Sequence, residues 1–334
     1  MMLDRLLAEK RYLLADGATG TNLFDMGLTS GDAPELWITQ HPDRIQALHR
    51  KFVEAGADII LTNTFGCNRR RMALHGLQDE TRHYNRLAAQ LARDVVKDAG
   101  RPIVVAGSVG PTGDLLAPLG ALTEDEAVDV FLEQMQGLND GGVDVIWIET
   151  MSAVEEMRAA ARAAAQLDMP YVLTASFDTA GRTMMGTTPD NLTVTLQQFV
   201  PPPFAIGANC GVGASDLIAS VLAMTAADPN AIVVAKANCG IPRVSGDKVH
   251  YTGTPELMQD YVRLAIDSGA RIVGGCCGTS PEHLTAMRKA LDGHSARARP
   301  NLDTVVKSLG ALVAPPNTSA APRRPSRRRD EKTT

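Results

Sequence analysis

Cysteine is the residue type in this sequence with the most distinctive chemistry. There are five, Cys67, Cys210, Cys239, Cys276 and Cys277. The first twelve residues carry charged side chains within their apolar pattern, so we find no secretory leader and expect a cytoplasmic protein. Thiols stay reduced in that compartment, and clustered reduced cysteines favour metal binding or catalysis over disulfides.

Three of these cysteines follow predicted strands whose ends meet at one rim of the fold. Cys210 is distant from Cys276 and Cys277 in the sequence, so the fold must bring the three together. Three thiolates leave one position of a tetrahedral zinc ion open for substrate. Gly275 and Gly278 allow the backbone to turn, so that both adjacent cysteines reach one ion. Spacing alone leaves zinc and buried apolar cysteines as equal alternatives, with a strained vicinal disulfide a distant third.

Carboxylates at the same rim indicate the kind of substrate. Asp16 and Glu149 end predicted strands, where they would hold an ammonium group; a structural ion pair is the competing interpretation of Glu149. A zinc ion bound only by sulfur is a weak Lewis acid, which disfavours hydrolysis. It binds an incoming thiol instead, and the thiol loses its proton on coordination. These residues therefore predict alkyl transfer to sulfur.

Short apolar runs alternate with longer segments of helical periodicity along most of the chain. The predicted strands are eight, at residues 12–18, 58–65, 103–110, 144–150, 171–177, 205–210, 231–238 and 271–277. Eight successive β-then-α units predict an α/β fold of the (β/α)8 TIM-barrel type. A doubly wound sheet is the second choice, but the sequence has no glycine-rich phosphate loop after its first strand. We expect the barrel to occupy residues 1–295 and a C-terminal extension with a disordered basic tail to occupy residues 296–334.

Charge and hydropathy exclude two classes of partner. The 334-residue chain has a net charge of −5, although its last twelve residues, from Arg323, carry +4, which leaves −9 on the remainder. An acidic body argues against nucleic acid as a partner. No apolar run reaches the roughly 18 residues that a membrane helix needs, so we expect no membrane partner.

Several segments together resemble the homocysteine S-methyltransferase family over about residues 10–293. They are residues 16–21 (DGATGT), 61–65 (LTNTF), 110–113 (GPTG), 149–150 (ET), 209–211 (NCG) and 274–279 (GGCCGT). The family consists of zinc-dependent barrels that methylate homocysteine to methionine. The resemblance implies a Zn²⁺ cofactor and homocysteine as substrate.

The resemblance also assigns roles to individual residues. It implies that Cys210, Cys276 and Cys277 are zinc ligands, whereas Cys67 and Cys239 are not. It implies that Asp16, Gly17 and Glu149 bind the amino acid part of homocysteine, with Asp16 and Glu149 in the catalytic centre. Asn238 matches an asparagine that completes the zinc shell, before substrate binds, in the homocysteine module of cobalamin-dependent methionine synthase.

The methyl donor is the least determined part of this interpretation. The sequence has no D-x-H-x-x-G cobalamin motif, so we expect a small onium donor such as betaine. The aromatic donor cage of the animal betaine enzyme falls on Ala33, Gly66 and Thr150, and Trp37 is the candidate substitute, with simple burial the equal alternative. A homocysteine-activating subunit of a split cobalamin-dependent synthase, with a corrinoid partner protein, is the alternative. A non-catalytic subunit that binds zinc and homocysteine is the alternative of another class.

Overall fold

The chain folds as a (β/α)8 barrel in the computed structural model, which describes residues 1–29, 31–245 and 248–313. Eight parallel strands form one sheet in the order β1-β10-β7-β6-β5-β4-β3-β2. A parallel bridge between Ala15 and Ile59 joins the two edge strands and closes the barrel. The predicted TIM barrel is confirmed, and the doubly wound sheet is excluded.

All eight predicted barrel strands are present, and most are shorter than predicted. Their bounds are β1 Leu13–Leu14, β2 Ile59–Leu61, β3 Val104–Val109, β4 Val145–Met151, β5 Tyr171–Ala175, β6 Ala205–Cys210, β7 Val233–Ala237 and β10 Ala270–Gly275. The strands are buried almost throughout, as expected where helices cover a parallel sheet. Polar residues that sequence patterns place at strand ends therefore lie at the start of the following loops.

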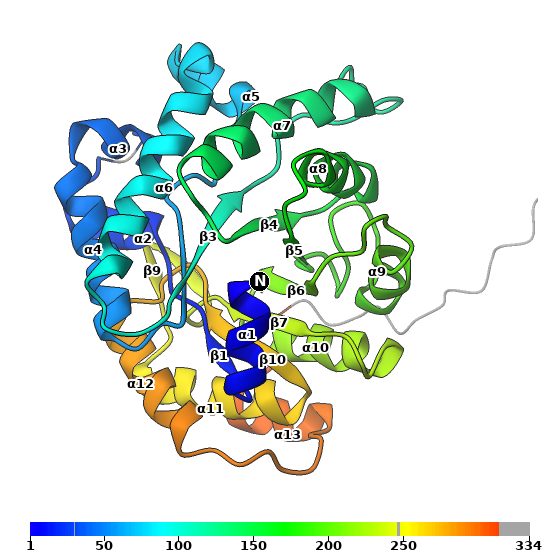
Figure 1. The fold of residues 1–334 in the computed structure, drawn as a ribbon. Helices are drawn as coiled ribbons and strands as arrows, with labels where there is room; N and C mark the ends of the chain where they lie inside the picture. Colours follow the sequence, from blue (N-terminus) through cyan, green and yellow to red (C-terminus); the bar gives the residue numbers. More distant parts are fainter. Residues whose placement is uncertain (30, 246–247, 314–334) are drawn as a thin grey trace, which may run out of the picture.

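An outer ring of helices covers the strands (Figure 1). The ring consists of α4 Pro42–Glu54, α6 Thr81–Lys97, α7 Glu124–Asp140, α8 Val154–Gln166, α9 Pro189–Leu196, α10 Ala214–Ala227, α11 Pro255–Asp267 and α12 Pro281–Asp292. Shorter helices occupy the loops after β1 and β2: α2 Gly20–Asp25, α3 Trp37–Gln40, α5 Arg69–Met72, and 3-10 turns at Pro34–Leu36, Ala73–His75 and Gln78–Glu80. These loop helices lie on the side of the barrel where the strands end.

Helix α1, Met2–Glu9, closes the opposite end of the barrel. Figure 1 shows it over the middle of the ring of strands. Its buried face consists of Leu3, Leu6 and Leu7, which pack in one apolar cluster with Leu13 and Trp147. Each fully buried leucine contributes roughly 1.5–3 kcal/mol. Helix α1 therefore covers the end of the barrel at which the strands begin.

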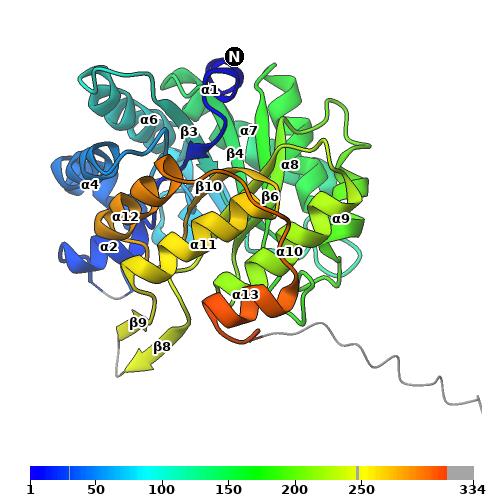
Figure 2. The same ribbon diagram turned by 90° about the horizontal axis from the view of Figure 1, so that it is seen from below.

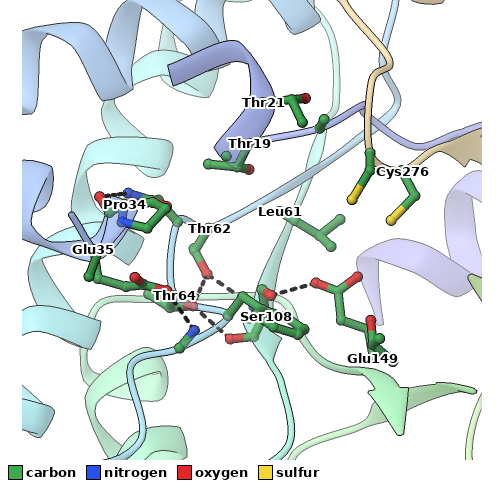
Figure 3. Close-up of a pocket in the computed structure, with 18 of the residues that line it drawn as sticks. Thr19, Thr21, Pro34, Glu35, Leu61, Thr62, Thr64, Ser108, Glu149 and Cys276 are labelled. Carbon is green, nitrogen blue, oxygen red and sulfur yellow. Dashed lines mark hydrogen bonds between the residues drawn. The ribbon is translucent and has the colours of Figure 1, made fainter. Parts of the chain in front are cut away.

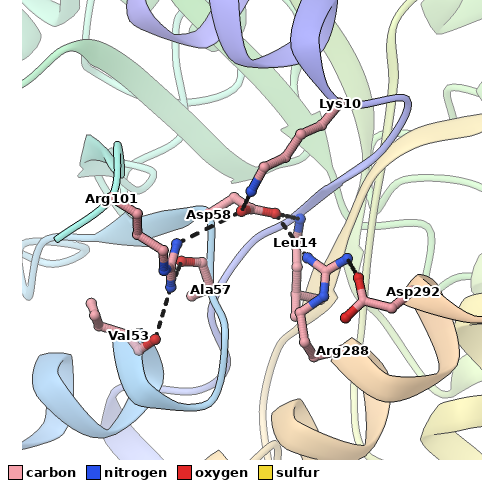
Figure 4. A network of polar contacts seen from close by, with 8 residues as sticks. All are labelled: Lys10, Leu14, Val53, Ala57, Asp58, Arg101, Arg288 and Asp292. Carbon is pink, nitrogen blue, oxygen red and sulfur yellow. Dashed lines mark hydrogen bonds and ion pairs between the residues drawn. The ribbon is translucent and has the colours of Figure 1, made fainter. Parts of the chain in front are cut away.

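A buried ion cluster fixes the same closed end (Figure 4). The carboxylate of Asp58, which is 1% exposed, lies 2.5 Å from Lys10 Nζ and 3.0 Å from Arg288 Nη1. Arg101 lies 3.7 Å away, and the backbone N–H of Leu14 donates a hydrogen bond of 3.0 Å to the other carboxylate oxygen. The cluster joins the segment after α1, the start of β2 and the last helix of the barrel.

Two elements lie outside the predicted pattern. A hairpin of β8 Pro242–Ser245 and β9 Lys248–Tyr251 follows β7, and Figure 2 shows it at the end of the barrel opposite α1. Helix α13, Leu302–Leu309, packs against α10 and α11 within the predicted C-terminal extension. The division into residues 1–295 and 296–334 stays a prediction, and the basic tail from Arg323 lies outside the described residues.

Among the described residues, no helix combines the length and apolar character needed to cross a lipid bilayer. The cytoplasmic location itself stays a prediction.

Candidate metal centre and substrate pocket

A cavity of about 690 Å³ opens where the barrel strands end (Figure 3). Catalytic groups of (β/α)8 enzymes gather at this end, because every strand points its carboxyl terminus there. The residues that line it lie at or just after the ends of β1, β3, β4, β6, β7 and β10. They include Gly17, Ser108, Glu149, Thr150, Cys210, Lys236, Cys276 and Cys277. The cavity thus collects most of the residues singled out from the sequence.

The sulfur atoms of Cys210, Cys276 and Cys277 all lie within 4.8 Å of one another. Cys210 ends β6 in the left-handed region, with φ of 61°, a conformation that costs an ordinary residue roughly 1–2 kcal/mol. Cys276 and Cys277 follow the last residue of β10, so the alternation of a regular strand does not separate them. Gly278 has φ of 80° and completes the turn, as expected for a glycine at this position.

The donor set fits a divalent metal ion. Hydrogen bonds among the three thiols act in both directions on the pKa of Cys210: the bond with Cys276 lowers it and the bond with Cys277 raises it. Burial adds to the rise, and the pKa of Cys210 reaches about 12. Three thiolates cannot share this space without a compensating cation, whereas a bound cation deprotonates coordinating thiols. Soft sulfur ligands in a group of three suit zinc with one open position.

Two further polar groups border the sulfur cluster. Asn238 donates from Nδ2 to the carbonyl of Gly211 at 2.6 Å, while its buried Oδ1 has no hydrogen-bond partner among the described residues. The hydroxyl of Tyr251, at the end of β9, hydrogen-bonds with Cys277. An unpartnered amide oxygen agrees with the predicted role of Asn238 as fourth ligand, which stays a prediction. Sequence reasoning missed Tyr251, because the hairpin that carries it was not predicted.

Asn209 joins the ends of three strands beside the cysteines. Its Oδ1 accepts hydrogen bonds from the backbone N–H of Thr150 at 2.9 Å and from Thr174 Oγ1 at 2.7 Å. Its Nδ2 donates to Thr150 Oγ1 at 2.7 Å and lies 3.9 Å from Cys276 Sγ. Thr150 also has a left-handed backbone, with φ of 63°. The asparagine therefore holds β4, β5 and β6 in the conformation that presents Cys210.

Glu149 is a buried carboxylate that faces the cavity. It is 8% exposed, and its Oε1 accepts a hydrogen bond of 2.6 Å from the hydroxyl of Ser108 (Figure 3). Burial raises the pKa of Glu149, although the charge of Lys236 and the Ser108 hydroxyl oppose the rise. No cation of the described residues lies within 4.0 Å of this carboxylate. The competing interpretation, a structural ion pair, is therefore not what the structure shows.

Asp16 differs from expectation, because it already has a cationic partner. Its Oδ1 lies 2.9 Å from Lys236 Nζ, and its Oδ2 accepts a hydrogen bond of 2.7 Å from the backbone N–H of Leu61. Asp16 is 2% exposed and is absent from the cavity lining, whereas Lys236 lines it. Asp16 therefore reaches the site through Lys236, and its role in binding the substrate ammonium stays a prediction.

Lys236 is the charged residue at the centre that sequence reasoning left without a role. Burial would lower its pKa, but the carboxylates of Asp16 and Glu149 outweigh burial and raise the pKa of Lys236. The side chain reaches Asp16 across the strand between them, where Gly274 pairs with Lys236 in the sheet register. A Cβ atom on Gly274 would lie 3.1 Å from Lys236 Cγ, so glycine makes room for the crossing.

The remaining predicted residues divide into two groups. Gly17 lines the cavity, and a Cβ atom there would lie 2.5 Å from the carbonyl oxygen of Thr279, so only glycine fits. Trp37 does not reach the cavity: it is 4% exposed, and the Arg44 guanidinium lies 4.7 Å from its ring centroid. The short helix α3 turns the indole into the core, which favours the alternative of simple burial, and contact between Trp37 and substrate stays a prediction. Cys67 and Cys239 are buried outside the sulfur cluster, as expected.

Comparison with known proteins identifies the family. The family described as homocysteine S-methyltransferase matches residues 13–291. Methionine synthase of Mycobacterium leprae is 29% identical over 330 residues, covering 93% of this chain and 26% of that protein. The chain therefore spans about a quarter of the length of that relative.

Solved structures of a homocysteine methyltransferase, MmuM of Escherichia coli, have the same fold. Its metallated form superposes with a TM-score of 0.71 at 24% identity, covering 86% of this chain and 99% of that one. The apo form gives a TM-score of 0.67 at 20% identity, covering 87% and 100%. With the family match spanning nearly the whole barrel, the conclusion is that this chain belongs to the homocysteine S-methyltransferase family.

Proposed function

We propose that this chain is a zinc-dependent homocysteine S-methyltransferase that produces methionine from homocysteine and a small onium donor such as betaine. The observation that carries the proposal is the position of three sulfur atoms, all within 4.8 Å of one another, in the same cavity as Glu149. The sulfur cluster suits a thiol substrate and the carboxylate suits an ammonium group. Homocysteine carries both a thiol and an ammonium group.

The balance of charge around Glu149 supports amino acid binding. Asp16 and Lys236 neutralise each other as a buried pair, which leaves Glu149 as the surplus negative charge. A substrate ammonium beside Glu149 would supply the missing counter-charge in a site of low dielectric.

Cys210, Cys276 and Cys277 would hold the zinc ion, with Asn238 at the fourth position before substrate binds. Bound zinc supplies the positive charge that makes a coordinated thiol lose its proton near neutral pH. Glu149 then fixes the amino acid end of homocysteine, so that its sulfur points toward the donor. Positioning of two reactants in a water-poor pocket contributes much of the rate in such transfers.

A direct assay tests the proposal. Purified zinc-loaded protein is incubated with homocysteine and betaine, and methionine is quantified by mass spectrometry. Methionine formation that is lost after chelation and restored by zinc is the expected result. Binding of zinc and homocysteine without turnover from any donor would select the non-catalytic subunit instead.

A second candidate is the homocysteine-activating subunit of a split cobalamin-dependent synthase. It is favoured by the similarity to methionine synthase of Mycobacterium leprae, of which this chain spans about a quarter. The same assay discriminates, because methylcobalamin or a methylated corrinoid protein would then support turnover where betaine does not.

A further inference from the structure

The cavity extends well beyond the sulfur cluster. Pockets of drug-sized ligands measure on the order of 300–1,000 Å³, so a cavity of about 690 Å³ has room for more than one small amino acid. Figure 3 shows Glu35 and Pro34 on one side of it, with Cys276 and Glu149 on the other. We call the side that contains Glu35, Gly66, Arg71 and His75 the distal end.

Glu35 places a buried carboxylate at the distal end. It is 7% exposed, and its Oε1 accepts a hydrogen bond of 2.6 Å from the backbone N–H of Gly66. A Cβ atom on Gly66 would lie 2.7 Å from this oxygen, so any side chain at position 66 would displace the carboxylate. Glycine at position 66 thus leaves the space that the Glu35 carboxylate occupies.

Positive charge faces Glu35 from the same end. Burial raises the pKa of Glu35, while the charges of Arg71 and His75, which line the same cavity, oppose this rise. Arg71 differs from its two neighbours: Arg69 pairs with Glu133 and Arg70 pairs with Asp114, while Arg71 has no ion pair among the described residues. The distal end therefore presents a negative group and an unpaired guanidinium to one shared space.

We propose that the distal end is a methyl-donor subsite that recognises a small onium carboxylate by charge instead of by an aromatic cage. The positive nitrogen or sulfur would lie against Glu35, and the donor carboxylate would lie against Arg71. This inference rests on the proposed function. It explains why the expected aromatic substitute, Trp37, is not needed at the cavity.

The chemistry balances without any further reactant. The thiolate of homocysteine forms a bond to the donor methyl carbon while the carbon–nitrogen or carbon–sulfur bond of the onium breaks. The bonding electron pair remains on the departing nitrogen or sulfur, so the donor leaves as a neutral amine or thioether. The proton of the homocysteine thiol has already been released to solvent.

Equilibrium binding tests the role of charge directly. The probes are betaine and 3,3-dimethylbutanoate, an isostere in which an uncharged carbon replaces the positive nitrogen. Both are titrated by calorimetry into zinc-loaded protein saturated with methionine, which does not react. Wild-type protein should bind betaine at least about tenfold more tightly than the isostere, the effect of one hydrogen bond or contact to a charged group. In Glu35→Gln, which keeps the shape and the Gly66 bond, this preference should disappear while isostere binding stays the same.

Two further variants separate the two charges. Arg71→Gln should weaken both probes by about tenfold, because both carry the carboxylate. Glu156→Gln is the matched control: Glu156 is a buried carboxylate bonded to the backbone N–H of Thr112 at 2.8 Å, and it does not line the cavity. It should leave both affinities within twofold of wild type, roughly the scatter of such a conservative change.

The donor class follows from parallel assays with betaine, a quaternary ammonium compound, and S-methylmethionine, a sulfonium compound. Equal affinity of wild type for betaine and its isostere would overturn the subsite, as would an unchanged preference in Glu35→Gln. Homocysteine methylation from methylcobalamin, without onium binding, would remove the subsite and leave the transferase intact. Failure to bind zinc and homocysteine would remove the proposed function and the subsite with it, whereas loss of the preference for betaine alone would remove only the subsite.

Discussion

The two ends of the barrel surround their buried carboxylates in opposite ways. At the closed end, Asp58 lies within 4.0 Å of Lys10, Arg101 and Arg288 and also accepts a backbone hydrogen bond. At the open end, Lys236 pairs with Asp16, and the hydrogen bond that Glu149 receives comes from a neutral hydroxyl. The closed end pairs its carboxylate with cations of the protein, whereas the carboxylate of Glu149 at the open end has no cation within 4.0 Å among the described residues.

This difference agrees with the separate roles expected of the two ends of a (β/α)8 barrel. Residues at the ends where strands begin serve stability, and residues at the ends where strands terminate serve chemistry. Replacing a carboxylate by its amide should therefore have different consequences at the two ends.

The largest effect should come from the sulfur cluster. Cys210→Ala removes one of three ligands, and zinc affinity should fall by more than about a hundredfold, the upper range for losing even an outer-shell partner. Turnover should be lost in parallel. Zinc content after dialysis, measured by mass spectrometry, checks this, with the buried Cys239→Ala as control. Retention of stoichiometric zinc by the Cys210 variant would show that the sulfur cluster is not the metal site.

At the closed end, Asp58→Asn should destabilise the fold. The amide leaves three cations around a neutral group, which costs about 3 kcal/mol, the low end for a broken buried pair because the partners are partly exposed. Urea denaturation measures the change in free energy of unfolding. The folded fraction should keep the wild-type KM for homocysteine. A variant as stable as wild type would contradict a structural role for Asp58.

At the open end, Glu149→Gln should impair binding and leave the fold intact. Losing a charged partner of the substrate ammonium should raise the KM for homocysteine about 10- to 100-fold. Steady-state kinetics with variable homocysteine check this, and Glu156→Gln serves as the control. An unchanged KM would mean that another group holds the ammonium.

The smallest effect is a dependence of stability on pH. Because burial raises the pKa of Glu149 in the folded state, its contribution to stability is present below the ordinary pKa of 4.5 and is lost as pH rises through the higher folded value. The amide of Glu149→Gln does not ionise, so the variant does not lose this contribution as pH rises. We therefore expect the difference in thermal midpoint between the variant and ligand-free wild type to be more in favour of the variant at pH 7 than at pH 4. The opposite trend would place a cation beside Glu149 in the free protein.

The barrel and the convergence of the cysteines were predictable from sequence because both follow from one rule. In a parallel barrel all strands terminate at the same end, so Cys210 and Cys276 had to approach each other once their strands were recognised. Glu149 followed by the same reasoning.

The partners of individual side chains were not predictable in this way. Asp16 meets Lys236 only because β10 lies between β1 and β7 and because Gly274 leaves room for the lysine to cross. Trp37 is a substrate candidate in the sequence because it follows the first strand, with burial the equal alternative. The short helix α3, which turns it inward, has too few residues to show periodicity. Glu35 and Tyr251 lie on a 3-10 turn and an inserted hairpin, neither of which the alternation of strands and helices indicates.

The sulfur cluster joins strands that are not neighbours, since β7 separates β6 from β10. An ion held by these three atoms would act as a clip that closes a long loop of chain, and such clips stabilise by restricting the unfolded ensemble. Separation of the last strands from one another would then require release of the ion. Release of zinc into solution would report the separation of β6, β7 and β10 before the rest of the barrel unfolds. A chromogenic chelator could follow this release in real time.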